Sequence, residues 1–326
     1  MSLPSPEVLV VESDLAGIRL HDFLSRSYPD AHRGDLRQLI SSGRVSVNGE
    51  VRLHDGKLRL NDVVMPEERP KPRARKSSAG SDLPQILLET ADLLVLSKPA
   101  GLSIGSSRSG SEPVTCAQLQ QLRPKDDLRV VHRLDRNASG CWIVAKGPSS
   151  ARHLETEFAG HRVKSTYIAL VAGVPNWGER EIDDLLGPDR RRPGMVLASA
   201  EPRPGFREAH TNVLVRERYG RHSLLELHPI TDCSHQIRVH LKSIGHPIVS
   251  DDGYGGERLL LSRLKADYKK RTGVEERPLL RRMFLHVERV EFFDVDGNEV
   301  VAVAPIPEDL GVALRHVEKH RSMRRT

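Results

Sequence analysis

Short apolar runs dominate the pattern of hydrophobic and polar positions from residue 85 onward. Runs of about four to eight apolar or alternating residues are typical of buried or half-buried strands. Two segments instead carry apolar residues at helical spacing: Leu154 and Phe158 lie four positions apart in 150–160, and 234–245 opens with Ser234, a candidate N-cap. The predicted strands cover 85–89, 93–98, 128–131, 141–145, 166–171, 211–215 and 223–227.

Strands dominate and helices are scattered, so this pattern favours an α+β fold with a mixed or antiparallel sheet over alternating βαβ units. Residues 9–65 differ, because two short helices precede a hairpin with an Asn48-Gly49 turn. Residues 66–84, rich in Pro, Arg, Lys and Ser, are predicted to be a linker to the larger domain, 85–326. The basic linker either contacts a phosphate backbone or serves only as a spacer. Residues 256–282 are predicted to form a basic, helical insertion.

Composition places the chain among water-soluble globular proteins. The chain has 326 residues, of which 38% are hydrophobic and 29% are charged, and its net charge of +6 allows a polyanionic partner without requiring one. The apolar runs are too short to span a membrane, and no secretory signal is visible. Three widely spaced cysteines indicate a reducing compartment, so we expect a cytoplasmic protein. Cys233 and His235 do not complete a zinc set, and no metal site is expected.

The candidate chemistry begins with Arg133 and Asp135, which stand between two predicted buried strands. Charged side chains in such a place must pair, face a cavity or leave the core. Asp135 is therefore either a catalytic carboxylate in a cavity or an ordinary turn residue, and its immediate neighbours do not separate these two interpretations.

The front module resembles the S4 RNA-binding domain over GIRLHDFLSRSYPDAHRGDLRQLISSGRVSVNGEV and the following KLRLNDVV. In that family the second helix and its adjoining loop present basic residues to structured RNA. The resemblance therefore implies RNA contacts from Arg33, Arg37 and Arg44, although each arginine alone would be an ordinary solvated charge. His32 departs from the family, which usually has Ser before its arginine.

The back module resembles the RluA-type RNA pseudouridine synthases in five segments that occur in the family's order. One joins His132-Arg133-Leu134-Asp135 to Ser139-Gly140, and the others are LLVLSKPAGL, KSTYIA with its following glycine, HPITDCSHQIRVHLKSIGHPIVSDDGYG and LHVERVEFFDVDGNEVVAVAPIPEDL. A lone HRLD would be only suggestive, but five ordered matches cover nearly the whole module. The expected function is isomerisation of uridines in structured RNA to pseudouridine.

That reaction breaks the N1–C1′ bond of uridine and rejoins the base through C5, so the resemblance implies no cofactor. It implies that Asp135 is the catalytic carboxylate, acting either as a nucleophile at C1′ or as a base on the sugar. It also implies that Tyr167 stacks on the target base and assists proton removal at C5, and that Arg238 pairs with Asp135 and keeps it ionised. The alternatives are a core tyrosine and a solvated arginine.

Arg133 is implied to enter the RNA stack in place of the extruded base, with a plain phosphate contact as the alternative. Lys98 and Lys164 complete the predicted RNA-binding set, and for both a structural, backbone-facing role is the favoured alternative. The match departs from the family at Asp232-Cys233, where Gly-Arg is usual. We expect Asp232 to cap the helix that starts at Ser234. Smaller departures are Ala138, Cys141-Trp142 and Ser250.

The predicted partner is RNA, with large-subunit ribosomal RNA favoured over tRNA, and the predicted state is a monomer away from membranes. One rival is an RNA-binding ribosome assembly factor that keeps the fold without turnover. A second rival is a small-molecule hydrolase that uses Asp135 and a nearby histidine.

Overall fold

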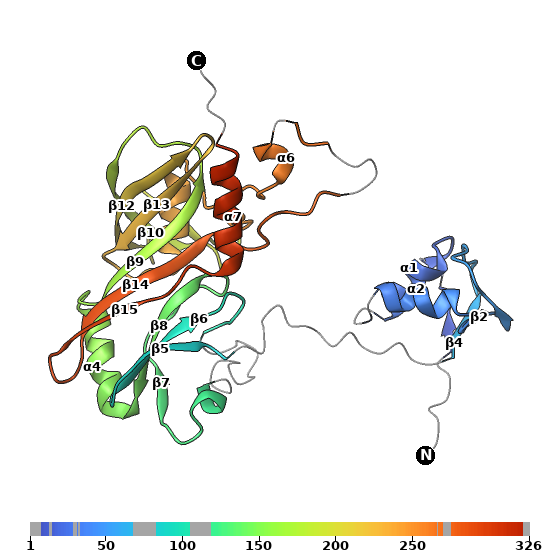
Figure 1. The fold of residues 1–326 in the computed structure, drawn as a ribbon, viewed down its shortest axis with the longest axis horizontal. Helices are drawn as coiled ribbons and strands as arrows, with labels where there is room; N and C mark the ends of the chain where they lie inside the picture. The colour runs from blue at the N-terminus through green and yellow to red at the C-terminus, as the bar shows by residue number, and fades with distance from the viewer. Residues whose placement is uncertain are drawn as a thin grey trace. The chain divides into compact units, whose positions relative to one another are not determined.

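The computed structural model describes residues 8–12, 15–28, 31, 33–67, 83–104, 119–265, 267–269 and 275–321. The chain forms two compact units, Met1–Gly80 and Ser81–Thr326, and each is described by itself (Figure 1). Most of the predicted linker, residues 68–82, lies outside the described residues. Cys116 and His32 lie outside them as well.

The first unit packs two helices against a four-stranded antiparallel sheet of order β1-β4-β2-β3. The Asn48-Gly49 turn that joins β2 to β3 has positive φ at both residues, 54° and 82°, as the predicted hairpin requires. The core of this unit contains the buried apolar residues of α1 and α2 together with Val45, Val47 and Val64 of the sheet. The elements are β1 (Leu9–Val10), α1 (Leu20–Ser27), α2 (Arg33–Ser41), β2 (Val45–Val47), β3 (Glu50–Val51) and β4 (Val63–Pro66).

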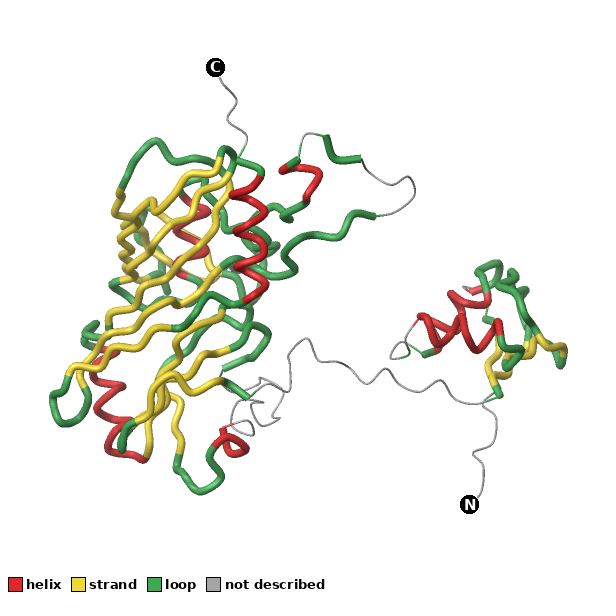
Figure 2. The backbone as a smooth tube through the Cα atoms, viewed as in Figure 1, coloured by secondary structure: helices red, strands yellow, loops and turns green. Residues whose placement is uncertain are grey.

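The second unit is built on an eleven-stranded mixed sheet (Figures 1 and 2). Its main path is β11-β10-β12-β13-β9-β14-β8-β6-β5, β15 pairs with β14, and β7 pairs with β8. Among these described strands, the only parallel pairing is that of β14 with β8. The strands are β5 (Gln85–Glu89), β6 (Leu93–Lys98), β7 (Leu128–Val130), β8 (Ser139–Lys146), β9 (Lys164–Ala172), β10 (Glu179–Pro188), β11 (Val196–Ser199), β12 (Arg207–Tyr219), β13 (His222–Pro229), β14 (Leu285–Phe293) and β15 (Glu299–Val303). The expected α+β fold with a mixed sheet is confirmed.

The close approach of β8 and β14 explains why position 140, in one of the matched segments, is a glycine. Gly140, the second residue of β8, has φ of 119°, and a Cβ atom there would lie 2.1 Å from the carbonyl oxygen of Val287 on β14. Any side chain at this position would separate β8 from β14. Gly140 thereby fixes the start of β8, which follows directly from the Asp135 turn.

The helices of the second unit are α4 (Gly147–Ala159), α5 (Gln236–Ser243), α6 (Leu261–Leu264) and α7 (Glu308–Lys319). Helix α7 lies in front of β9 and β14 in Figure 1, and α5 packs against β10, β11, β12 and β13. Helix α4 begins three residues earlier than predicted, with a proline in its first turn, where the missing N–H costs nothing.

Two predictions about α5 are wrong. The residue before its first helical turn is His235, in the left-handed conformation, and no described side chain caps the helix. Ser234 and Asp232 therefore do not act as caps. Gln236 instead organises the preceding loop: its Oε1 accepts hydrogen bonds from the Thr231 hydroxyl (2.9 Å) and the Cys233 N–H (3.0 Å).

The predicted helical insertion is also largely wrong. Among the described residues of 256–282, only Leu261–Leu264 are helical. The segment is held instead by its ends: the N–H of Leu279 donates to the carbonyl of Leu259, and Leu259 and Leu280 are buried in the main core. Like charges without an apolar stripe do not stabilise a helix by packing, so Lys265 already has an extended backbone.

Across the described residues, no helix has the length and apolar character needed to cross a bilayer.

Candidate active site

The turn that carries Asp135 is anchored on both sides by buried groups. The N–H of Ala138 donates to the carbonyl of Asp135 (3.0 Å), and Leu134 is buried in the core beside β8. His132 stacks on Phe158 of α4 at 4.5 Å, and its Nε2 accepts the N–H of Ile143 (2.8 Å). Burial lowers the pKa of His132 to about 3, so the imidazole is neutral and acts as a fixed acceptor.

Lys98 is not an RNA contact, contrary to that prediction. Its side chain is fully buried, and Nζ lies within 3.2 Å of the carbonyl oxygens of Pro99, Leu102, Arg136 and Ala138. The favoured alternative, a lysine that faces the backbone, is what the structure shows. Burial lowers the pKa of Lys98 to about 7. The lysine therefore ties the end of β6 to the turn that carries Asp135.

Arg238 brings two carboxylates together in the first turns of α5. Its Nη1 donates to Oδ2 of Asp135 at 3.2 Å, across 103 positions of sequence. Its Nε and Nη2 donate to the two oxygens of Asp251 at 2.7 and 2.8 Å. This bidentate pair fixes the guanidinium plane. The side chain of Asp251 is 2% exposed and that of Asp135 is 22% exposed, so only Asp135 is open to a substrate.

Tyr254 packs beneath this ion-pair group. Its ring lies 4.6 Å from the guanidinium carbon of Arg238, and the residue is buried. Its hydroxyl accepts the N–H of Val196 (3.0 Å) and lies 2.7 Å from Nδ1 of His235. The other ring nitrogen, Nε2 of His235, lies 3.7 Å from Oδ1 of Asp135. Asp135 is thus flanked by two side chains of the same helix start.

Tyr167 lies on β9, where its partly buried ring packs against the two main hydrophobic clusters of the domain. Burial raises its pKa above the ordinary value, and the charges of Asp232 and Asp135 raise it further. Tyr167 therefore stays protonated at neutral pH and presents an aromatic surface in the field of both carboxylates.

Arg133 and Asp232 interact electrostatically in this region. Arg133 is exposed, on the same turn as Asp135. Burial raises the pKa of Asp232, and Arg133 is the first of the charges that oppose this rise. The residue that departs from the family is thus a second carboxylate, near the arginine predicted to enter the RNA.

The remaining predicted contacts are Lys164 in the second unit and three arginines in the first. Lys164 is exposed at the first position of β9, opposite Glu291. In the first unit Arg37 is exposed on α2, and Nε of Arg44 lies 3.6 Å from a carboxylate oxygen of Glu67. Arg33 is the first residue of α2, and the placement of its side chain is outside the described part of the structure.

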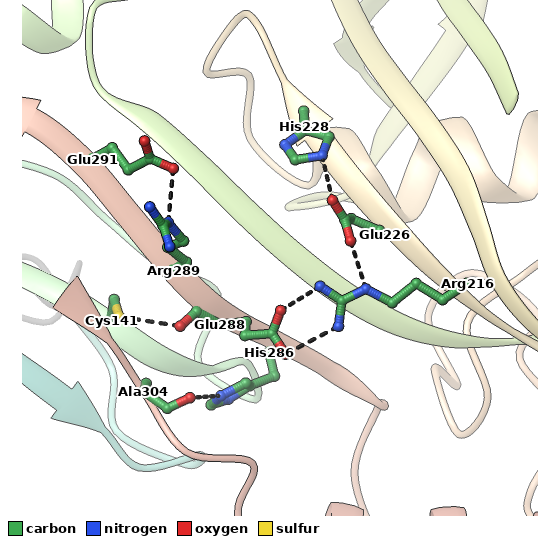
Figure 3. Close-up of polar contacts among 9 residues, drawn as sticks. All are labelled: Cys141, Arg216, Glu226, His228, His286, Glu288, Arg289, Glu291 and Ala304. Atoms are coloured by element: carbon green, nitrogen blue, oxygen red, sulfur yellow. Dashed lines mark hydrogen bonds and ion pairs between the residues drawn. The ribbon is translucent and has the colours of Figure 1, made fainter. Parts of the chain in front are cut away.

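An ionic bridge spans the sheet (Figure 3). Arg216 of β12 donates to Glu226 of β13 and to both oxygens of Glu288 on β14. Arg216 and Glu288 each stand where the strand register shifts. The bridge crosses β9, the strand that carries Tyr167. In the register of β13 with β9, Glu226 lies opposite Ile168, and Leu227 lies opposite Tyr167. Alternate residues of a strand face opposite sides of a sheet, so the bridge supports β9 from the side away from Tyr167.

Sequence reasoning missed His235, Asp251 and Tyr254. All three stand in the matched segment 228–255, which also contains Arg238. The available signal was that polar, potentially reactive side chains recur within this segment. Apolar spacing carries no information about them, because their contacts depend on the turn that follows Ile248. Within the described residues no cluster of His, Cys, Asp and Glu has the arrangement of a metal site.

Comparison with known proteins identifies the class. A family model described as RNA pseudouridylate synthase matches residues 92–243, and a model of the S4 domain matches residues 18–64. Two solved human structures share the fold: RNA Pseudouridylate Synthase Domain Containing 4, with a TM-score of 0.57 and 23% identity over 71% of this chain and 92% of that one, and Domain Containing 1, with 0.55 and 24% over 74% and 95%.

Named relatives extend the match to nearly the whole chain. The ribosomal large subunit pseudouridine synthase C of Escherichia coli strain K12 is 31% identical over 98% of both chains. The protein of that name from Vibrio cholerae is 30% identical over 93% of this chain and 94% of its own. The chain therefore belongs to the RNA pseudouridine synthase family. It is an RNA pseudouridine synthase with an S4 domain in front of its catalytic domain.

Proposed function

We propose that this enzyme converts uridines of large-subunit ribosomal RNA to pseudouridine with Asp135 as the reacting carboxylate. The observation that carries the proposal is the 3.2 Å contact between Nη1 of Arg238 and Oδ2 of a carboxylate that remains 22% exposed. The hydrogen-bonded ion pair holds the carboxylate in place, and the exposure leaves it accessible. The choice of RNA rests on the names of the relatives, which act on the large ribosomal subunit.

Two routes are open to Asp135. As a nucleophile, one oxygen bonds to C1′ while N1–C1′ breaks, and the freed uracil anion turns until C5 attacks C1′ and displaces the carboxylate. As a base, Asp135 takes the C2′ proton while the base leaves, and returns it when C5 rejoins C1′. In both routes C5 then loses its proton and N1 gains one. RNA deuterated at C2′ separates the routes, because only the second breaks the C2′–H bond.

The other predicted residues have roles around this carboxylate. Tyr167 supplies a flat surface for the uracil and assists proton removal at C5 as a relay, because its protonated hydroxyl can accept the C5 proton only while it passes its own hydrogen to water. Arg133 fills the space left in the RNA stack by the extruded nucleotide, which offsets part of the few kcal/mol that extrusion costs. Exposed Arg37 on α2, together with Arg44 between α2 and β2, suits an S4 domain that holds structured RNA by its phosphates.

The test is turnover of RNA tritiated at uridine C5, because every pseudouridine formed releases one C5 hydrogen to water. Wild-type protein should release tritium from unmodified large-subunit ribosomal RNA, and Asp135→Asn should bind the same RNA without release. If the wild type binds but releases none from this RNA or from tRNA, the RNA-binding assembly factor becomes the better account. Release from tRNA alone would reassign the substrate.

The hydrolase rival does gain one observation, because His235 lies 3.7 Å from Asp135. Membership of the RNA pseudouridine synthase family outweighs it.

A further inference from the structure

His235 is held in a conformation that non-glycine residues rarely adopt. Its backbone is left-handed, with φ of 56° and ψ of 19°, at the residue that precedes α5. Such a conformation persists where surrounding contacts determine it, often at functional sites. Here the ring is wedged edge-on against Tyr254, with centroids 5.6 Å apart, and its side chain is 24% exposed.

The contacts of Tyr254 favour one position for the proton of the imidazole. The Tyr254 hydroxyl oxygen already accepts the N–H of Val196 at 3.0 Å, so its own hydrogen is free to point to Nδ1 of His235 at 2.7 Å. A neutral imidazole that accepts at Nδ1 carries its hydrogen on Nε2. That nitrogen faces Oδ1 of Asp135.

The charges around the ring come from three elements. Asp135 and Arg133 lie on the turn before β8, Arg238 lies on α5, and Asp251 lies after Ile248. Burial lowers the pKa of His235 below its ordinary value; Arg238 and Arg133 act in the same direction, while Asp135 and Asp251 oppose them. The imidazole is therefore neutral at neutral pH, and Nε2–H is a donor without full charge.

We propose that His235 is a second positioning residue for Asp135, holding Oδ1 through Nε2–H while Arg238 holds Oδ2. The proposal rests on the function proposed above. At 3.7 Å the Nε2–Oδ1 contact is longer than a hydrogen bond, and such contacts commonly tighten when substrate closes the site. Donors on both oxygens fix the plane of the carboxylate, and each oxygen keeps a free lone pair for the ribose. One donor alone would leave the carboxylate free to rotate.

The contact can be tested without turnover, by NMR of ¹⁵N-histidine-labelled full-length protein. We expect the His235 ring to show the tautomer with hydrogen on Nε2. Because the charge of Asp135 raises the pKa of His235, Asp135→Asn should lower that pKa. The His228 ring, which bonds to Glu226, is the matched control, and its resonances should not change. A hydrogen on Nδ1, or the same His235 titration in both proteins, would overturn the proposal.

Kinetics test whether the contact positions the acid. His235→Ala should lower kcat about 100-fold with little change in KM for RNA, because misplacing a reacting group by about 1 Å has that effect. His235→Asn should recover part of kcat, because asparagine tolerates the left-handed backbone and keeps a donor. His228→Asn is the control and should keep wild-type kcat.

The pH profile distinguishes positioning from a purely structural role. In the wild type, protonation of His235 at acid pH turns the neutral donor into a cation. Its ion pair with Asp135 then makes the carboxylate less reactive toward the ribose. The acid limb of kcat should therefore move to lower pH in His235→Asn. Wild-type kcat in the alanine variant, or an acid limb that does not move in His235→Asn, would refute the positioning role. If NMR shows the contact while the wild type never releases tritium, the function proposed above fails and the contact stands.

Discussion

The two carboxylates that share Arg238 should separate stability from activity. Asp251 binds the guanidinium through two hydrogen bonds of 2.7 and 2.8 Å and is 2% exposed, whereas Asp135 receives one of 3.2 Å and is 22% exposed. We predict that Asp251→Asn mainly destabilises the domain. Asp135→Asn should mainly remove activity.

The magnitudes follow from burial. Breaking a buried, hydrogen-bonded ion pair costs about 3–5 kcal/mol, and the amide introduced by Asp251→Asn keeps one acceptor, so the lower end of this range, about 3 kcal/mol, applies. For a domain of this size, 1 kcal/mol corresponds to about 2–4 °C, so Tm should fall by about 6–12 °C. Removing the charge of the more exposed Asp135 leaves Arg238 bound to Asp251 and should cost about 1 kcal/mol or less.

Activity should show the reverse order. An amide is neither nucleophile nor base, so Asp135→Asn should lose at least about 1,000-fold in tritium release. Asp251→Asn should retain measurable turnover well below its lowered Tm, since Asp135 is intact. Calorimetric Tm and tritium release on the same preparations check both statements. Equal destabilisation by the two changes, or an active Asp135→Asn, would refute the division of roles between them.

Three further predictions concern the surrounding residues. Lys98→Met should lower the free energy of unfolding by about 3 kcal/mol, because buried carbonyl oxygens lose their hydrogen-bond donor. The salt dependence of RNA binding, measured by filter binding, should stay unchanged. A steeply altered salt slope would contradict the assignment of Lys98 as a buried, structural lysine. His132 has its pKa lowered to about 3, so between that value and about 6.5 only the unfolded chain binds its proton. Stability should thus fall by about 2 kcal/mol as the pH drops from 7 to 5, and urea titrations of His132→Gln, which cannot titrate, should show a smaller fall than the wild type. Arg133→Ala should reduce the slope of log affinity against log salt by about 1 if the arginine neutralises one phosphate, and an unchanged slope would assign it to stacking alone.

Repetitive features were predictable from the sequence. Apolar runs located seven of the eleven strands of the central sheet, but β10, β11, β14 and β15 were not among the predicted strands. The helical spacing of Leu154 and Phe158 located α4. The Asn48-Gly49 pair gave the hairpin, because few dipeptides suit a turn with two positive φ angles. Resemblance, not periodicity, paired Asp135 with Arg238. No local pattern encodes a contact across 103 positions.

The errors have physical causes. A lysine in a sequence does not reveal whether carbonyl groups will surround it, so Lys98 was assigned to RNA although it is buried. Ser234 matched the preferences of an N-cap, but His235 in the left-handed conformation precedes α5, and its contacts with Tyr254 belong to tertiary structure. Asp251 and Tyr254 acquire their roles only when the turn after Ile248 folds against α5.

The most direct test of the central claim, that Asp135 held by Arg238 forms pseudouridine in RNA, is a nucleotide-resolution pseudouridine map. Large-subunit ribosomal RNA would be taken from cells of the source organism that lack this protein, carry the wild type, or carry Asp135→Asn. We predict that defined pseudouridines vanish without the protein, return with the wild type and stay absent with Asp135→Asn, although the variant folds and binds the RNA. Identical maps in all three, or full restoration by Asp135→Asn, would contradict the claim.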